Sequence, residues 1–148
     1  MCNGLLLCLY LILAGFSSEL LIAGPGSGWG MSSRYNQMFD TKSVVEIEGT
    51  VEEVLYRSPL RGMSSGVHLR VKAKDKTYEV HLGPKWYIDN QEAKIEKGDQ
   101  IKIAGSKIKF DGADAIIAES VTKGDQMLVL RDNSGRPNWA GWRNCCRP

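Results

Sequence analysis

The sequence predicts an all-β domain, a five- to six-stranded barrel with one short helix. Three observations support this fold class. Apolar and polar residues alternate with a period of two over most of residues 45–130, as they do in strands that bury one face. The alternation changes phase twice near glycines, which is typical of bulged, strongly bent strands. The only helical signal lies between the third and fourth strands, and this order is that of the OB fold.

The first expected strand covers residues 45–56. Apolar residues take the odd positions from Val45 to Val51, and the phase changes at Glu53. A phase change shortly after Gly49 indicates a bulge that sharpens the bend of the strand. We therefore expect this strand to be strongly bent.

The remaining elements follow from the same alternation and from turn residues. Residues 58–66 form a loop before the second strand. The expected elements are strands over 67–73 and 78–82, a short helix that begins near Pro84, a strand over 101–110 with a phase change at Gly105, a hairpin turn at Asp111-Gly112, and strands over 115–122 and 127–130.

The N-terminus predicts export. Residues 4–16 form an uncharged apolar run of thirteen, which suits a signal peptide and is shorter than the roughly 20 residues of a membrane span. We expect residues 1–23 to be a signal peptide and the protein to be periplasmic or secreted; the alternative is a membrane anchor over residues 5–23. The other expected segments are a Gly/Ser/aromatic linker over 24–43, the barrel over 44–131 and a Trp-containing tail over 132–148.

Composition narrows the functional classes. The chain has 148 residues and a formal net charge of +2, which suits one small domain and lacks the strongly basic balance typical of proteins that bind long duplexes. Cys145 and Cys146 are adjacent near the C-terminus, so no disulfide framework or Cys-x-x-Cys motif is present. No nucleophile elbow or phosphate-binding loop occurs. The sequence predicts a protein that is not an enzyme.

A resemblance spans most of the chain. The runs VEIEGTVEEV, RGMSSGVHLRVK, VHLGPKWYIDNQ, GDQIKIAGSKI and LVLRDNSGRPNWAGW, with GWGM and YNQMFD before them and AIIAESVTKGD between the last two, resemble a set of small, exported, uncharacterised bacterial OB-fold proteins. The resemblance covers residues 28–143. It implies the barrel and a periplasmic location, and it implies no particular activity.

The outward face of strands two and three is the expected ligand surface of an OB barrel. Alternation gives this face His68, Arg70 and Lys72 on the second strand and Thr77, Glu79 and His81 on the third, with Arg61 in the loop before them. The face carries no Phe, Tyr or Trp on which bases could stack, so single-stranded nucleic acid is an unlikely ligand and weak polyanion binding is a minor alternative. We expect a noncatalytic binding or adaptor module of the cell envelope, whose partner is an envelope protein or a small ligand.

The histidines suggest an alternative function, which is periplasmic metal binding. His68 and His81 each lie in a Val-His-Leu context. If inward residues pair with inward residues, the index sum of partners on these strands is odd, and a short turn after Ala73 gives a sum of 149. This register places His68 opposite His81 and Arg70 opposite Glu79. Two neighbouring imidazoles suit Zn or Cu, with Met31, Met38 and Met63 as softer ligands; otherwise both histidines lie on a solvated face.

Three tryptophans have expected roles. Trp86, at the start of the short helix, is expected to close an open end of the barrel. Trp139 and Trp142 lie in a polar, Gly-containing tail. They either fold back over the barrel or anchor a protein partner, and both possibilities follow from the sequence.

Overall fold

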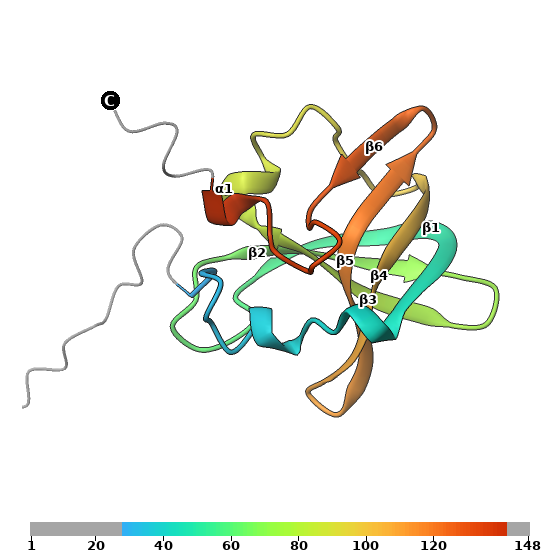
Figure 1. Ribbon diagram of the computed structural model, residues 1–148. Coiled ribbons are helices and arrows are strands. Elements are labelled where there is room, and N and C mark those ends of the chain that lie inside the picture. Colours follow the sequence, from blue (N-terminus) through green and yellow to red (C-terminus); the bar gives the residue numbers. More distant parts are fainter. Residues whose placement is uncertain (1–27, 142–148) are drawn as a thin grey trace, which may run out of the picture.

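The computed structural model describes residues 28–141, which form a β-barrel with a short helix at one end (Figure 1). The predicted signal peptide, Trp142 and the adjacent residues Cys145 and Cys146 lie outside the described residues. The elements are β1 (Val44–Arg57), β2 (Gly66–Lys72), β3 (Thr77–Pro84), α1 (Lys85–Ile88), β4 (Gln100–Phe110), β5 (Ala113–Lys123) and β6 (Gln126–Val129), with 3-10 helices at Asn36–Met38 and Thr41–Ser43.

The strands close into the predicted barrel. Their order is β3-β2-β1-β4-β5-β6, and a parallel pairing of β3 with β5 joins the two sides. Five strands therefore make the barrel, and β6 extends it along the free edge of β5. This arrangement, with α1 between β3 and β4, confirms the OB-like fold.

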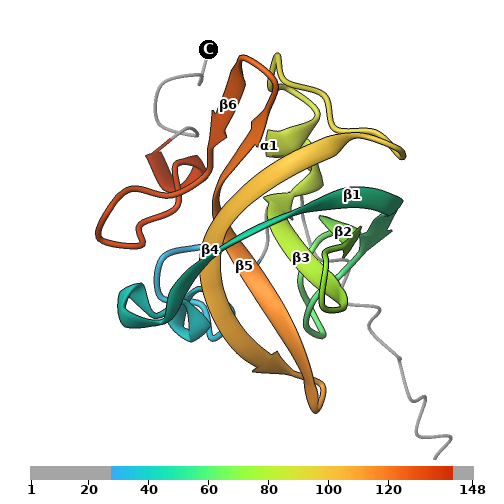
Figure 2. The same cartoon turned by 90° about the vertical axis from the view of Figure 1, so that its right-hand side faces the viewer.

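Both predicted bends occur in the long strands. The pairing of β1 with β2 shifts register between Val51 and Glu53, and that of β4 with β5 shifts between Ala104 and Gly105. These are the positions at which the alternation changes phase, and β4 curves across the barrel in Figure 2. The bends let β1 pair with β2 at one end and with β4 at the other.

The barrel interior holds the inward residues of the predicted alternation. Leu69, Val71 and Val80 on β2 and β3 are fully buried, and apolar residues of every other strand pack against them. Trp86 is partly buried and packs against this core. Burial of apolar side chains at about 25 cal/mol per Å² supplies the main stabilisation of such a barrel.

The predicted linker is part of the folded domain. Trp29 and Tyr35 are 2% and 1% exposed, and the indole N–H of Trp29 donates to the carbonyl of Ser64 at 3.1 Å. Further along, the N–H of Asp40 donates to the Ser106 hydroxyl on β4. Trp29, Tyr35 and Asp40, within the expected linker over residues 24–43, therefore lie against the barrel. The alternation of apolar and polar residues could not predict these contacts with the barrel, because the segment forms no long helix or strand.

The C-terminal tail docks as well. Trp139 is 2% exposed, and its indole N–H donates to the carbonyl of Trp29 at 3.0 Å. The two indoles meet edge to face with centroids 6.0 Å apart. Of the two possibilities that the sequence left open for Trp139, folding back is confirmed. An exposed anchor for a partner is excluded for this residue, because no face of the indole is free.

Two glycines on paired strands let the indoles approach. A Cβ at Gly66 would lie 2.7 Å from the Trp29 ring, and one at Gly83 would lie 2.7 Å from the Trp139 ring. Any larger residue at either position displaces an indole, because real Cβ atoms do not come this close. The ends of β2 and β3 thus form a flat surface for the docked aromatics.

Arg131 ties the tail to the N-terminal segment. The side chain is 1% exposed, and its guanidinium donates to the Asn36 side-chain oxygen at 2.8 Å and to the Gly135 carbonyl at 3.1 Å. It lies over the rings of Phe39 and Trp139 at 5.0 and 5.1 Å. Burial lowers the pKa of Arg131 to about 10, so this cation remains charged near neutral pH.

A candidate metal site of two histidines and a glutamate

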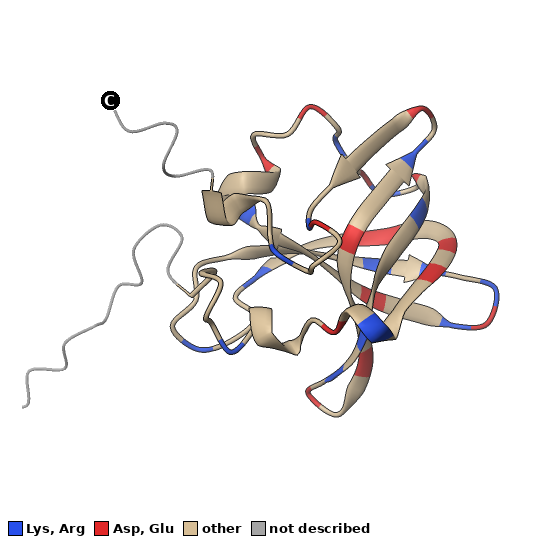
Figure 3. Cartoon of the chain, in the orientation of Figure 1, with Lys and Arg blue, Asp and Glu red and all other residues tan. Residues whose placement is uncertain are grey.

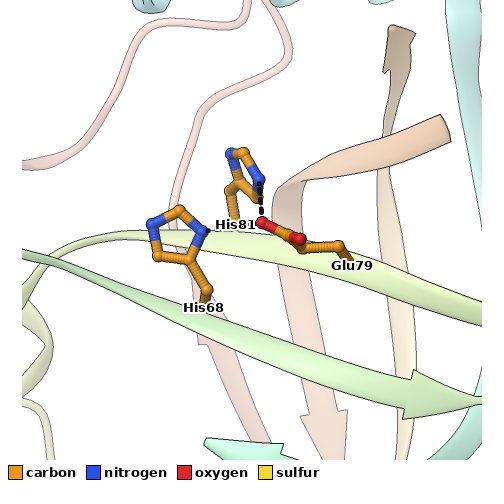
Figure 4. A group of neighbouring side chains, drawn as sticks. All are labelled: His68, Glu79 and His81. Carbon is orange, nitrogen blue, oxygen red and sulfur yellow. Dashed lines mark hydrogen bonds and ion pairs between the residues drawn. The ribbon is translucent and has the colours of Figure 1, made fainter. Parts of the chain in front are cut away.

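The predicted register between β2 and β3 is confirmed from His68 to Lys72. His68 pairs with His81, Leu69 with Val80 and Arg70 with Glu79. The imidazole rings of the two histidines are neighbours, with centroids 4.2 Å apart. Figure 4 shows both rings rising from adjacent strands on the same side of the sheet.

The histidines are buried, and the expectation that they face solvent is wrong. Each is 1% exposed. The Tyr35 ring stacks on His81 at 5.9 Å, and the Phe110 ring meets His81 edge-on at 4.8 Å. Alternation assigned the histidines to the correct face of the strands, opposite Leu69 and Val80. It could not show that the N-terminal segment covers that face.

Glu79 completes a cluster with the two histidines. Its Oε1 lies 3.0 Å from His81 Nε2 and 3.4 Å from His68 Nδ1, and Figure 4 shows the carboxylate directed toward both rings. One ligand atom from each residue lies within 4.8 Å of the other two. Two imidazoles and a carboxylate are therefore held together by a strand pair, which is a more rigid support than a loop.

The far nitrogen of His81 has its own partner. His81 Nδ1 lies 3.1 Å from the Tyr35 hydroxyl, and Nε2 of the same ring lies 3.0 Å from Glu79. Contacts of this kind orient metal-binding histidines in known sites by fixing which nitrogen carries the proton. His68 Nδ1 lies 3.4 Å from Glu79 and has no hydrogen-bond partner among the described residues.

Arg57, at the end of β1, is a member of the site that the sequence did not reveal. Its guanidinium donates to the same Oε1 of Glu79 that contacts the histidines. Burial of Glu79 raises the pKa of its carboxyl, but the hydrogen bond from Arg57 and the neighbouring His81 outweigh burial, and the pKa is lowered overall. Glu79 is therefore ionised at neutral pH and available as a ligand.

Both histidines are neutral at physiological pH. Burial lowers the pKa of His68 to about 4, with a further contribution from the nearby Arg57 charge. Burial also lowers the pKa of His81 to about 3, and His68 contributes in the same direction. Neutral imidazole is the form that binds metal ions. Because the ionised Glu79 only accepts hydrogen bonds, His81 Nε2 carries the ring proton in this structure, and an ion could bind this nitrogen only after the proton moves to Nδ1, beside the Tyr35 hydroxyl.

The other candidate residues do not join the cluster. Arg70 lies opposite Glu79 in the register, as predicted, but its ion pair is with Glu53 at 2.8 Å. Lys72 and Thr77 are exposed. Arg61 lines a separate pocket of about 450 Å³ with Tyr35 and Met63. Basic and acidic positions are interspersed along the chain in the cartoon of Figure 3.

A small pocket adjoins the cluster. It has a volume of about 200 Å³, and Glu79, Thr77 and Arg70 lie in its wall together with Phe110 and Asp114. The Glu79 side chain is 32% exposed, whereas both histidines are 1% exposed. Glu79 is therefore the most accessible member of the cluster, and it is the member that lines this pocket.

The donor set matches first-row divalent ions. Two imidazoles and one carboxylate bind Zn²⁺ in hydrolases and Fe²⁺ in oxygenases, in each case with open positions on the ion. Ligand atoms about 2.1 Å from a tetrahedral ion lie about 3.4 Å apart, and the two contacts of Glu79 Oε1, 3.0 and 3.4 Å, are close to this spacing. All three ligand atoms lie within 4.8 Å of one another, so the side chains would have to move closer together to bind one ion.

The fold and the cluster together define an OB-type β-barrel with a buried candidate metal site on its outer face. The chain belongs to the MamS/MamX magnetosome protein family, whose model matches residues 43–128. That span contains His68, Glu79 and His81, whereas Tyr35 precedes it. No curated protein matches the chain. Among residues 28–141, no helix is long and apolar enough to cross a membrane.

Solved structures with a similar arrangement include two OB-like chains. One, from the S. pombe Stn1-ten1 complex, has 15% identity and a TM-score of 0.41, and the match covers 68% of this chain and 66% of that one. The other is the N-terminal domain of PriB from Thermoanaerobacter tencongensis, with 14% identity, a TM-score of 0.41, and coverage of 57% of this chain and 99% of that one.

Proposed function

We propose that this member of the MamS/MamX family is an exported, noncatalytic protein that binds a divalent transition-metal ion through His68, Glu79 and His81. The observation that carries the proposal is the state of His68. Its ring is 1% exposed, and its Nδ1 faces Glu79 at 3.4 Å without a hydrogen bond. A buried nitrogen without a partner is costly, and a metal ion would use its lone pair.

A purely structural role accounts for less of the geometry. A hydrogen-bond network explains the contacts of His81 with Glu79 and Tyr35, but it leaves the Nδ1 of His68 without a function. Nitrogen and carboxylate donors favour Zn²⁺ or Cu²⁺ over Cu⁺, which prefers sulfur. We take Zn²⁺ as the reference ion for testing.

Calorimetric titration with Zn²⁺ tests the proposal. The full chain is used with Cys2, Cys8, Cys145 and Cys146 replaced by serine, so that thiols do not bind the metal. His68→Ala and His81→Ala should each weaken Zn²⁺ binding by more than about 100-fold. Lys102→Ala, at an exposed position on β4, is the matched control and should bind as the parent does.

Because His68 and His81 are buried, their replacement can disturb the fold. Glu79→Gln keeps the size of the side chain at a partly exposed position and removes the charge, so it should also weaken binding while the melting temperature stays close to that of the parent. Zn²⁺ binding that survives both histidine substitutions would place any metal elsewhere, and a parent chain that binds no Zn²⁺ would reject the proposed function.

Export is tested separately. Residues 1–30 fused to a reporter that is active only outside the cytoplasm should give activity, because the apolar run at 4–16 acts as an insertion signal. A fusion with two of its leucines replaced by arginine is the control, since charges in this region block insertion. Reporter retained in the cytoplasm by the unaltered fusion would contradict the proposed compartment.

A further inference from the structure

We infer that the ion at this site is bound together with a small oxyanion, held between the metal and the Arg57 guanidinium beside Glu79. The inference rests on the proposed metal-binding function. The oxyanion would be a carboxylate or a phosphate group. Three features of the described residues support it: the coordination number, the position of Arg57 and the charge of the site.

The protein supplies too few ligands for a filled coordination sphere. The cluster offers three donor atoms, while Zn²⁺ takes at least four ligands and most other first-row ions take more. The rings of Tyr35 and Phe110 cover His81, and both histidines are 1% exposed while Glu79 is 32% exposed. The open positions of the ion therefore face the Glu79 side of the cluster.

Arg57 has to move when an ion arrives. Its guanidinium and an incoming ion both require Oε1 of Glu79, the atom that contacts both histidines. A dication within bonding distance of this oxygen repels the guanidinium. The Arg57 side chain is 48% exposed, so it is free to turn toward solvent. Its planar set of N–H donors then matches an oxyanion bound at an open position of the ion.

A site that holds the metal ion would carry excess positive charge, which favours the binding of an anion. Neutral histidines, one Glu79 carboxylate, a dication and Arg57 sum to two positive charges in a partly buried site. Arg70 is paired with Glu53. Asp114, which lines the same pocket as Glu79, lies within 4 Å of Lys76, Lys107 and Lys109, so its charge is offset and does not oppose an anion. An oxyanion removes the excess positive charge, which is costly where solvent is limited.

Zn²⁺ titrations with and without acetate test the inference on the full cysteine-free chain. In a non-coordinating buffer, millimolar acetate should tighten Zn²⁺ binding by about tenfold, within the usual range of coupling between two ligands. In the Arg57→Gln variant acetate should give no gain. That variant should bind Zn²⁺ at least as tightly as the parent without acetate, because the competing guanidinium is gone.

Controls separate the two proposals. Arg136→Gln removes an exposed arginine from the C-terminal tail and should keep the full acetate effect, while inorganic phosphate in place of acetate distinguishes the two anion types. Acetate also binds free Zn²⁺, but equally for every variant. The inference would be overturned if neither acetate nor phosphate changed Zn²⁺ binding by the parent chain. It would also be overturned if acetate tightened Zn²⁺ binding equally in Arg57→Gln. Either result would leave the proposed metal binding intact. Absence of Zn²⁺ binding under all conditions would reject the proposed function itself.

Discussion

Replacing Trp139 by alanine is expected to lower the free energy of unfolding by about 3–5 kcal/mol, the usual cost of truncating a buried aromatic residue. The indole is 2% exposed and contacts the Trp29 and Tyr87 rings at 6.0 and 5.6 Å and the Arg131 guanidinium at 5.1 Å. The substitution leaves a cavity above Gly83. It also removes one of the contacts that hold the buried cation of Arg131.

Thermal and urea denaturation measure this effect. A loss of this size should lower the melting temperature by more than about 10 °C in a domain of this length. Asn133→Ala changes an exposed residue of the same tail and should leave the melting temperature unchanged. A chain truncated before Arg131 should lose at least as much stability as Trp139→Ala. An unchanged melting temperature in either altered chain would mean that the tail is not docked in solution.

The strands and their register were predictable because two local rules determine them. Alternation assigns each residue of β2 and β3 to a face, and antiparallel partners keep a constant index sum until a bulge intervenes. These rules place His68 opposite His81 without any knowledge of the rest of the fold. The rules fail only at the beginning of β2, where the pairing with β3 shifts register between Val67 and His68.

The burial of the histidines was not predictable from these rules. It depends on residues 29–40, which have no periodicity, and on the docking of Trp139 against Trp29. The available signal was weak. Gly66 pairs with Pro84 and Gly83 pairs with Val67, so the two glycines lie near each other on adjacent strands. The sequence also has several aromatic residues outside the strands, but nothing local shows which aromatic residue contacts which glycine.

The ion pairs of the site show a similar limit. Register alone places Arg70 opposite Glu79, yet Arg70 also pairs with Glu53 of β1, and the ion pair forms on that side. Glu79 instead contacts Arg57, two strands away. Long charged side chains reach beyond their direct partners, so the ion pairs of a three-stranded surface follow from three-dimensional geometry. Arg57 was missed for this reason.

The metal-free protein is expected to lose about 4 kcal/mol of stability between pH 7 and about pH 5, with contributions of roughly 2 kcal/mol from each histidine. In the unfolded chain both histidines have the ordinary pKa of 6.5, whereas burial lowers the folded-state pKa of His68 to about 4 and of His81 to about 3. Below pH 6.5 the unfolded state therefore binds more protons than the folded state. Stability is highest above pH 6.5 and falls as the pH decreases toward 4.

Urea denaturation in the presence of a chelator measures this dependence. His81→Gln should reduce the loss between pH 7 and about pH 5 by about half, because one of the two shifted groups no longer titrates. Acidic side chains contribute little in this interval, since the ordinary carboxyl pKa values lie lower. Excess Zn²⁺ should restore stability at about pH 5 in the parent but not in His81→Gln, because an ion that binds only the folded state stabilises it. A stability that does not change between the two pH values would mean that His68 and His81 are not buried in solution.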